Sequence, residues 1–188
     1  MLEVRPASRA DRREVVRVLA TAFADDPVMR WLVPTGLRLE PLFGAHVRMA
    51  NADRQVVDLA LRDGEPVGAA IWHEPGYRPG PWRQLASLPR YAIALRRNLG
   101  RGAELENLLH GVRPDEEFWY LAGVGAVHRG EGIGSALLQH RLELVGGPAY
   151  LESSKQENLA LYTRFGFEVR DSLRPPDGPE LWPMRRPP

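Results

Sequence analysis

The chain has 188 residues, which matches the usual size of one domain, and its 44% hydrophobic and 26% charged residues are typical of a globular protein. Its 25 Lys and Arg residues against 24 Asp and Glu residues give a formal net charge of +1, which argues against a general binder of polyanions such as nucleic acid. The lack of cysteine excludes a disulfide framework, a cysteine zinc site and a cysteine acyl-enzyme.

The N-terminal residues lack the charged start and apolar core of a signal peptide. The longest conspicuous apolar stretch, residues 118–127, is shorter than the roughly 20 residues that a membrane-spanning helix needs. We therefore expect one domain, residues 1–188, in the cytoplasm and without a membrane or nucleic-acid partner. The sequence leaves open whether the protein is a monomer or a homodimer.

The start of the chain predicts a strand followed by helices. Residues 2–5 are short and partly apolar, which favours a strand. Ser8 and Asp11 resemble a capping box, and apolar residues at helical spacing predict an amphipathic helix over residues 9–23. Residues 28–51 show weaker helical signals.

A hairpin follows. Residues 56–61 and 66–72 are apolar runs, and the Asp63-Gly64 pair between them is a strong signal for a tight turn. The chain should therefore form two antiparallel strands here.

The middle of the chain predicts two helices. Residues 74–81 are rich in proline and glycine and predict a connecting loop. Helical patterns then cover residues 82–99 and 103–109, and we expect the helix to break at residues 100–102, where two glycines lie.

The second half alternates strands and helices. A near-continuous apolar run over residues 118–127 predicts a strand buried on both faces. Later patterns predict helices over residues 135–145 and 158–165 and strands over residues 149–153, 167–173 and 180–184. The order of elements indicates an α/β (α+β) protein whose mixed central sheet of about seven strands is flanked by helices.

A glycine-rich turn separates the apolar strand from the next helix. Gly130, Gly132 and Gly134 allow backbone N–H groups to approach an anion, and the helix N-terminus adds partial positive charge. The turn therefore predicts a pyrophosphate site, against the simpler alternative of a tight turn without a ligand.

Three phosphate motifs compete for this turn. A P-loop is excluded because Glu131 stands where lysine is required. The dinucleotide fingerprint fails at Ser135, which replaces its third glycine, although Glu152 lies at the distance of about 20 residues where an acid would bind ribose. The third pattern, Arg/Gln-x-x-Gly-x-Gly/Ala, is matched by Arg129, Gly132 and Gly134.

A second segment follows in the matching order. Residues 150–154, with the sequence Tyr-Leu-Glu-Ser-Ser, precede Asn158, Tyr162 and residues 165–167, Phe-Gly-Phe. In these two segments the sequence resembles the GNAT acetyltransferase superfamily, whose first motif cradles the pyrophosphate of acetyl-CoA. The resemblance implies the GNAT fold with acetyl-CoA as cosubstrate.

The resemblance also implies an activity. We expect N-acetyl transfer to a primary amine of a small molecule, with an aminonucleoside or a related antibiotic as a candidate acceptor, by direct transfer in a ternary complex. Two alternatives stay open: a catalytically silent acyl-CoA-binding regulator and a dinucleotide-binding protein. The cofactor contacts implied by the resemblance are Val124, Ala126, Val127, Arg129, Gly130, Gly132, Gly134, Ser135, Asn158 and Tyr162.

One segment departs from the family pattern. The family usually has Val-x-Pro-x-x-Gln/Arg before the glycines, whereas the segment Val127-His128-Arg129 is shorter and lacks the proline. The resemblance therefore leaves open which backbone groups of residues 124–129 hold the acetyl group.

The resemblance assigns the general acid to Tyr162, because the family's tyrosine at this position protonates the leaving sulfur. A phenol has a pKa of about 10, comparable to that of a thiol. The alternative is a tyrosine that packs beside Phe165 and Phe167. Glu152 could accept the proton of the amine, or it could hold loop backbone or an arginine.

Other candidates have equally simple alternatives. Asn158 could contact the cofactor, cap its helix, or do both, and Arg129 could bind phosphate or remain a solvated turn residue. The five histidines show no metal-ligand spacing, so we expect no metal. An acceptor pocket could be lined by residues that could equally belong to the core: Phe23, Asp25, Asp26, Trp31 and Trp72.

Overall fold

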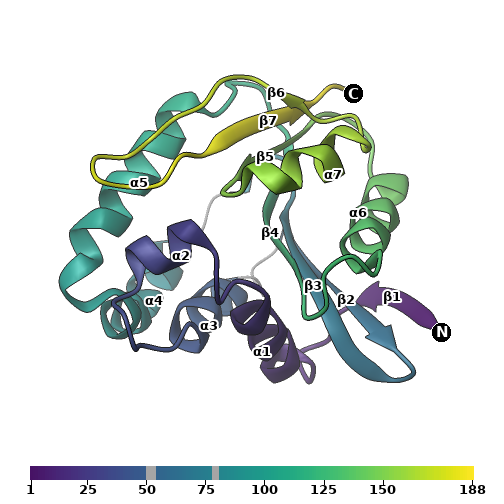
Figure 1. Ribbon diagram of the computed structural model, residues 1–188, viewed down its shortest axis with the longest axis horizontal. Helices are drawn as coiled ribbons and strands as arrows, with labels where there is room; N and C mark the ends of the chain where they lie inside the picture. The colour runs from purple at the N-terminus through teal and green to yellow at the C-terminus, as the bar shows by residue number, and fades with distance from the viewer. Residues whose placement is uncertain (50–53, 78–80) are drawn as a thin grey trace.

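A mixed sheet forms the centre of the computed structural model, which describes residues 1–49, 54–77 and 81–188 (Figure 1). Its strands follow the order β1-β2-β3-β4-β5-β7-β6. They are β1 (Leu2–Pro6), β2 (Gln55–Arg62), β3 (Glu65–His73), β4 (Trp119–Ala126), β5 (Ala149–Ser153), β6 (Glu168–Val169) and β7 (Trp182–Arg186). All neighbours pair antiparallel except β4 and β5, which are parallel. The predicted mixed sheet flanked by helices is confirmed.

Helices cover both faces of this sheet. They are α1 (Arg12–Ala22), α2 (Pro27–Leu32), α3 (Glu40–Met49), α4 (Pro81–Leu95), α5 (Leu99–Val112), α6 (Ile133–Leu144) and α7 (Leu159–Thr163), with 3₁₀ turns η1 (Arg96–Asn98) and η2 (Gln156–Asn158). Two predicted segments lie partly outside the described residues. They are the helical stretch 28–51, at positions 50–51, and the loop 74–81, at positions 78–80.

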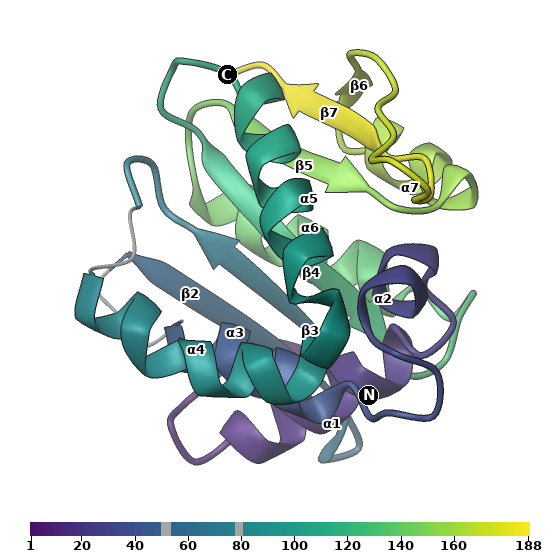
Figure 2. The same ribbon diagram turned by 90° about the vertical axis from the view of Figure 1, so that its left-hand side faces the viewer.

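The core has one layer on each side of the sheet. On one side, α1 and α3 pack on β2 and β3 through residues such as Leu19, Leu59 and Ile71. On the other side, α6 packs through Leu137 against a cluster that includes Trp72. Figure 2 shows α4 and α5 crossing in front of the sheet on the first side. This arrangement places α5 close to the ends of β4 and β5.

The break between α4 and α5 differs from the prediction. It lies at η1 rather than at the two glycines, and Arg96 has a φ of +47° there. Tertiary contacts set this position: the Asn98 side chain donates to the Leu32 carbonyl at 3.0 Å. Gly102 lies inside α5, where a Cβ would come within 2.8 Å of Leu95. The glycine therefore permits close packing and does not end the helix.

Strands β4 and β5 separate soon after they meet. They pair only at Trp119 with Ala149 and at Tyr120 with Tyr150. The prediction that this apolar run is buried on both faces is wrong: within β4 only Leu121 is fully buried. Because β4 has no ladder partner on the β5 side beyond this point, its backbone N–H and C=O groups remain available to a ligand along that edge.

The predicted strand 167–173 is much shorter in the structure. Only β6 pairs with β7, and Leu173 forms an isolated bridge with Leu181. Beyond this bridge, a turn at residues 175–178, closed by the Gly178 N–H donating to the Pro175 carbonyl at 3.0 Å, leads the chain back toward β7.

A buried ion pair joins the sheet to α6. Arg141 donates to both carboxylate oxygens of Asp58, through Nε at 2.9 Å and through a second, shorter contact. The Asp58 side chain is 0% exposed and that of Arg141 is 9% exposed. An isolated charge at this depth would be strongly disfavoured.

Replacing Asp58 by asparagine should therefore lower the free energy of unfolding by about 3–5 kcal/mol, because the Arg141 charge stays buried without its partner. Urea denaturation followed by circular dichroism measures this. Arg17→Met is the control: it removes an exposed ion pair with Glu14 and should cost no more than about 1 kcal/mol. Equal losses in the two variants would contradict the expectation.

Candidate active site

The glycine turn opens onto free space at the N-terminus of α6. Gly130 and Gly132 have φ values of +77° and +76°, and a Cβ built at either position meets nothing within 4 Å. Gly132 is the N-cap of α6, and the first helical hydrogen bond is from the Ala136 N–H to the Gly132 carbonyl at 2.9 Å. The preceding N–H groups lack intrahelical acceptors. Glu131, the acid within the turn, is paired with Arg62. This turn therefore fits a pyrophosphate.

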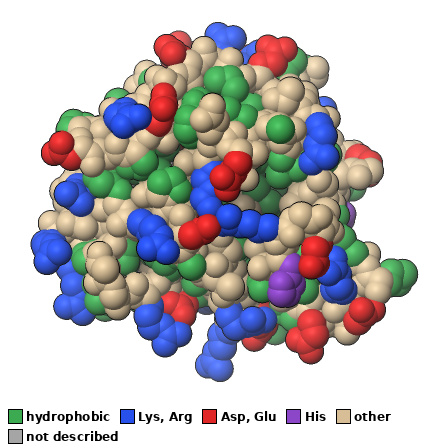
Figure 3. Space-filling view, viewed as in Figure 1, with side chains coloured by type: hydrophobic (Ala, Val, Ile, Leu, Met, Phe, Trp, Pro, Cys, Tyr) green, Lys and Arg blue, Asp and Glu red, His purple; other side chains and the backbone are tan. Residues whose placement is uncertain are grey.

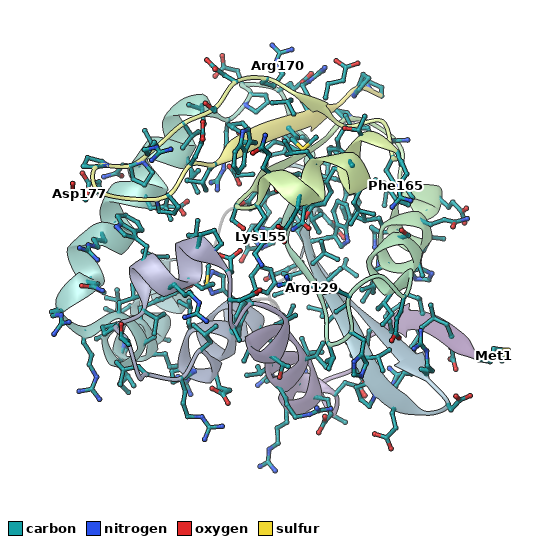
Figure 4. The ribbon with its side chains drawn as sticks, viewed as in Figure 1. Met1, Arg129, Lys155, Phe165, Arg170 and Asp177 are labelled. Atoms are coloured by element: carbon teal, nitrogen blue, oxygen red, sulfur yellow. The ribbon has the colours of Figure 1, made fainter. Side chains whose placement is uncertain are left out.

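An ion cluster crosses the region between the turn and the end of β5. Asp25, just after α1, is paired with Arg129 from the turn and with Lys155 from the segment after β5, the latter at 2.9 Å. Arg129 also lies 3.6 Å from Glu157. Figure 4 shows the labelled Arg129 and Lys155 side by side between α1 and α7. The hydrogen bond from Lys155 is the largest influence holding the pKa of Asp25 below its usual range.

A cavity of about 270 Å³ lies beside this cluster. Figure 3 shows acidic and basic side chains gathered near a hollow in this face of the molecule. The cavity brings together four residues considered in the sequence analysis: Ala126 at the end of β4, Val127 just after it, and Asp25 and Arg129 from the ion cluster. Its lining residues are Thr21, Ala22, Ala24, Asp25, Arg30, Ala126, Val127 and Arg129.

Tyr162 combines a packed ring with an unengaged hydroxyl. The residue is 7% exposed, and its ring meets that of Phe167 edge-on with centroids 6.2 Å apart. Among the described residues no hydrogen bond engages its hydroxyl. Burial raises the pKa of Tyr162, and the charge of Asp26 raises it further. The phenol therefore keeps its proton throughout the neutral pH range.

Glu152 lies in a buried hydrogen-bond network. Its side chain is 3% exposed and accepts from Arg113 Nε at 3.2 Å and from the Tyr120 hydroxyl at 2.7 Å. Arg113 also donates to the Tyr120 hydroxyl at 3.1 Å and to Glu106 at 3.1 Å. Burial raises the pKa of Glu152, although Arg113 and Tyr120 oppose this shift. Glu152 therefore does hold an arginine, which was the second interpretation of this residue from the sequence.

Asn158 precedes α7 but makes no side-chain capping hydrogen bond. The expectation that it caps its helix is wrong, because the preceding 3₁₀ turn η2 already leads the chain into α7 with helical backbone angles at Asn158. Its half-buried side chain is left for other contacts.

Two proposed acceptor-pocket residues are structural. Trp72 is 0% exposed in the core beneath α6, so it cannot line an open pocket. Asp26 is 3% exposed and caps α2, accepting from the Val28 and Met29 N–H groups at 3.0 Å, and its other carboxylate oxygen accepts from Ser154. These donors hold the carboxylate in place, away from solvent, and burial raises its pKa although the hydrogen bonds oppose this shift.

The other aromatic candidates lie between elements. Phe23 packs on the glycine face of β4, where a Cβ on Gly125 would come within 3.1 Å of its ring. Trp31 lies under the Arg101 guanidinium, 5.4 Å from the ring centroid, and close to Gly178. Both rings are half-buried, so neither position decides between core and pocket.

Sequence reasoning missed Arg113, Tyr120 and Lys155. Tyr120 lies in an apolar run and Arg113 follows a helix far along the chain from Glu152, so no local spacing connects them. Lys155 did carry one signal, because it is the sole lysine of the chain.

The described residues contain neither a metal-ligand cluster nor a membrane-spanning helix. No group of three or more His, Asp or Glu side chains there is arranged to hold a metal ion. None of the helices in the same part of the chain is long and apolar enough to cross a membrane.

Comparisons with known proteins agree with the geometry. No protein-family model matches the chain. An uncharacterised N-acetyltransferase of Schizosaccharomyces pombe is 25% identical over 181 residues, which cover 87% of this chain and 73% of that protein. A solved structure from Corynebacterium glutamicum, described as histone acetyltransferase HPA2 and related acetyltransferase, is 29% identical with a TM-score of 0.78, and the match covers 100% of this chain and 96% of that one.

A more distant structure shows the same fold. A GNAT-family acetyltransferase from Brucella melitensis in complex with acetyl-CoA is 15% identical with a TM-score of 0.56, and the match covers 100% of this chain and 90% of that one. The chain thus has the GNAT N-acetyltransferase fold, and its relatives support an acyltransferase.

Proposed function

We propose that the chain is an acetyl-CoA-dependent N-acetyltransferase acting on the primary amine of a small molecule through one domain, residues 1–188. The observation that carries this proposal is the separation of β4 from β5 beside an open glycine turn at the N-terminus of α6. A free backbone edge for the pantetheine arm then lies beside an anion site for the pyrophosphate, as the binding of acetyl-CoA requires.

The residues that would hold acetyl-CoA fall into two groups. N–H groups of Gly130, Gly132, Gly134 and Ser135 would bind the pyrophosphate. The edge of β4 at Val124 and Ala126, with Val127 just beyond the strand, would bind the pantetheine arm, and Asn158 would contact it from η2. Arg129 would exchange Asp25 for a phosphate, since its present partner is an exposed carboxylate.

Bound acetyl-CoA supplies an activated acetyl group, to which the acceptor nitrogen bonds as the carbon–sulfur bond breaks. Tyr162 donates its phenolic proton to the departing sulfur. Glu152 takes the proton lost by the amine, directly or through water. Because the chain has no cysteine, a cysteine acyl-enzyme is excluded, and this favours direct transfer in a ternary complex.

An aminonucleoside or a related antibiotic is the acceptor that we propose. The support is sequence likeness outside the two motifs: residues 5–7, residues 22–25 and β7 resemble the corresponding segments of puromycin N-acetyltransferase. Phe23 and Asp25 belong to one of these segments and lie near the end of β4.

Acetyl-CoA should raise the unfolding temperature of the protein, whereas NAD and NADP should not. With acetyl-CoA present, a panel of primary amines that includes aminonucleosides should release thiol, measured with a thiol reagent. Stabilisation by acetyl-CoA without thiol release from any amine would favour a silent acyl-CoA-binding regulator. Stabilisation by NAD or NADP alone would contradict the proposal.

A further inference from the structure

We propose that Arg113 is a positioning residue of the reaction, which holds the Glu152 carboxylate charged and aimed at the acceptor amine. The inference rests on the proposed function, in which Glu152 takes the amine proton. It assigns a role in the site to α5, which lies between the hairpin and β4 and outside both sequence motifs.

The geometry around Arg113 fixes its orientation from several sides. It follows α5 as the C-cap residue, and its N–H donates to the Leu109 carbonyl at 3.2 Å. Its guanidinium lies 4.6 Å from the centroid of the Tyr120 ring and donates to that hydroxyl at 3.1 Å. A third donor reaches Glu106 at 3.1 Å. The third guanidinium nitrogen, Nε, donates to Glu152 at 3.2 Å, so each of the three nitrogens has a partner that holds the group in this orientation.

The network around Glu152 is closed. Arg113 donates to one carboxylate oxygen of Glu152, and Tyr120, itself an acceptor from Arg113, donates to the other. Both carboxylate oxygens thus accept a hydrogen bond, one from Arg113 and the other from a hydroxyl that Arg113 holds in place. A carboxylate oxygen has two lone pairs, so each pinned oxygen retains one that can accept a proton. Loss of Arg113 would free the Tyr120 hydroxyl as well as the carboxylate.

Charge supports the same role. The titratable and charged groups that face Glu152 are Arg113 and Glu106 from α5, Tyr120 from β4 and Tyr150 from β5 itself. Burial raises the pKa of Glu152, Arg113 lowers it, and the Glu106 charge raises it. Arg113 is the one cation in this set, so its removal leaves a buried carboxylate beside another acid.

The test is the pH dependence of kcat/KM with one fixed acceptor amine. A base must be ionised to act, so the acid limb of the profile follows the pKa of Glu152. In Arg113→Met this limb should move to higher pH by about 1–3 pH units, the usual influence of a neighbouring opposite charge. In Glu106→Gln the limb should move to lower pH, because a like charge has been removed. In Arg113→Lys it should return close to the wild-type position while kcat stays reduced, since lysine restores the charge without the planar fork.

Controls separate this role from a structural one. Arg174→Met removes an exposed cation near Glu180 and should leave the profile unchanged. Arg113→Met combined with Glu152→Gln should be no slower than Glu152→Gln alone, because Arg113 acts through Glu152. Variants are compared only if their thermal unfolding remains cooperative, and Arg113→Lys preserves the test if the methionine variant does not fold.

Four outcomes would overturn the inference: an acid limb that stays in place in Arg113→Met, a wild-type kcat in Arg113→Lys, additive losses in the double variant, or full turnover in Glu152→Gln. None of them contradicts the proposed acetyl transfer itself, because transfer by the wild-type protein is measured separately; full turnover in Glu152→Gln would remove only the role proposed for Glu152. If the wild type binds acetyl-CoA but transfers no acetyl group, the proposed function fails before the variants are compared.

Discussion

Replacing Tyr162 by phenylalanine should reduce turnover with acetyl-CoA by about 10²–10⁴-fold, the usual contribution of a general acid. The ring stays in place against Phe167, so packing should change little. The affinity for acetyl-CoA should also change little, because the hydroxyl acts mainly as charge develops on sulfur. Burial that raises the pKa of the phenol also disfavours a bare thiolate, so an unassisted leaving group would be costly in this position. Single-turnover rates and calorimetric binding of acetyl-CoA measure the two effects.

A graded leaving group sharpens this test. The rate loss in Tyr162→Phe should shrink for an acetyl thioester whose thiol has a lower pKa, because that sulfur needs less protonation. Tyr91→Phe is the control, since it removes the hydroxyl of a half-buried tyrosine elsewhere in the chain, in α4. Near wild-type turnover of Tyr162→Phe on a step shown to be chemical would return Tyr162 to a packing role.

Two elements predicted from local signals were found where expected. The Asp63-Gly64 pair predicted the hairpin turn, and both residues have positive φ, +51° and +86°, as the tight turn requires. The strand over residues 149–153 has the predicted bounds. These features depend on a few adjacent residues, so one sequence contains the information that determines them.

Features set by tertiary contacts were not predictable in this way. The break before α5 depends on Asn98 and the carbonyl of Leu32, which lie 66 positions apart. The exposure of β4 depends on where it leaves β5, and an apolar run has no signal for the loss of a neighbouring strand. An apolar strand that lines a ligand path resembles, in sequence, a strand that is buried on both faces.

The candidate site likewise has a part that local sequence predicts and a part that depends on tertiary contacts. The glycine turn, Asn158 and Tyr162 lie in contiguous motifs and could be named from the sequence. The partner of Glu152 comes from 39 positions away, and that of Lys155 from 130 positions away. Pairs of charges at such separations follow from the fold, and only the fold shows that Asp25 already has two cationic partners.

Replacing Gly132 by glutamate should lower the affinity for acetyl-CoA by about 100-fold or more while the protein stays folded. Gly132 has a φ of +76° and open space around its Cβ position, so the new side chain would project into the region where the phosphates are proposed to bind. A carboxylate there would repel them and displace at least one N–H donor, and a hydrogen bond to a charged group is worth about 1.5–3 kcal/mol. Calorimetry with acetyl-CoA and circular dichroism measure binding and fold.

Gly147→Glu is the matched control for this last experiment. Gly147 follows α6 at its other end, with a φ of +87° and nothing within 4 Å of its Cβ position, so the substitution adds the same charge and a similar backbone strain. Both variants should lose about 1–2 kcal/mol of stability from a left-handed backbone that a side chain disfavours. Only Gly132→Glu should lose binding, because only that glycine lies at the N-terminus of the helix. Equal affinities in the two variants would place the pyrophosphate somewhere other than this turn.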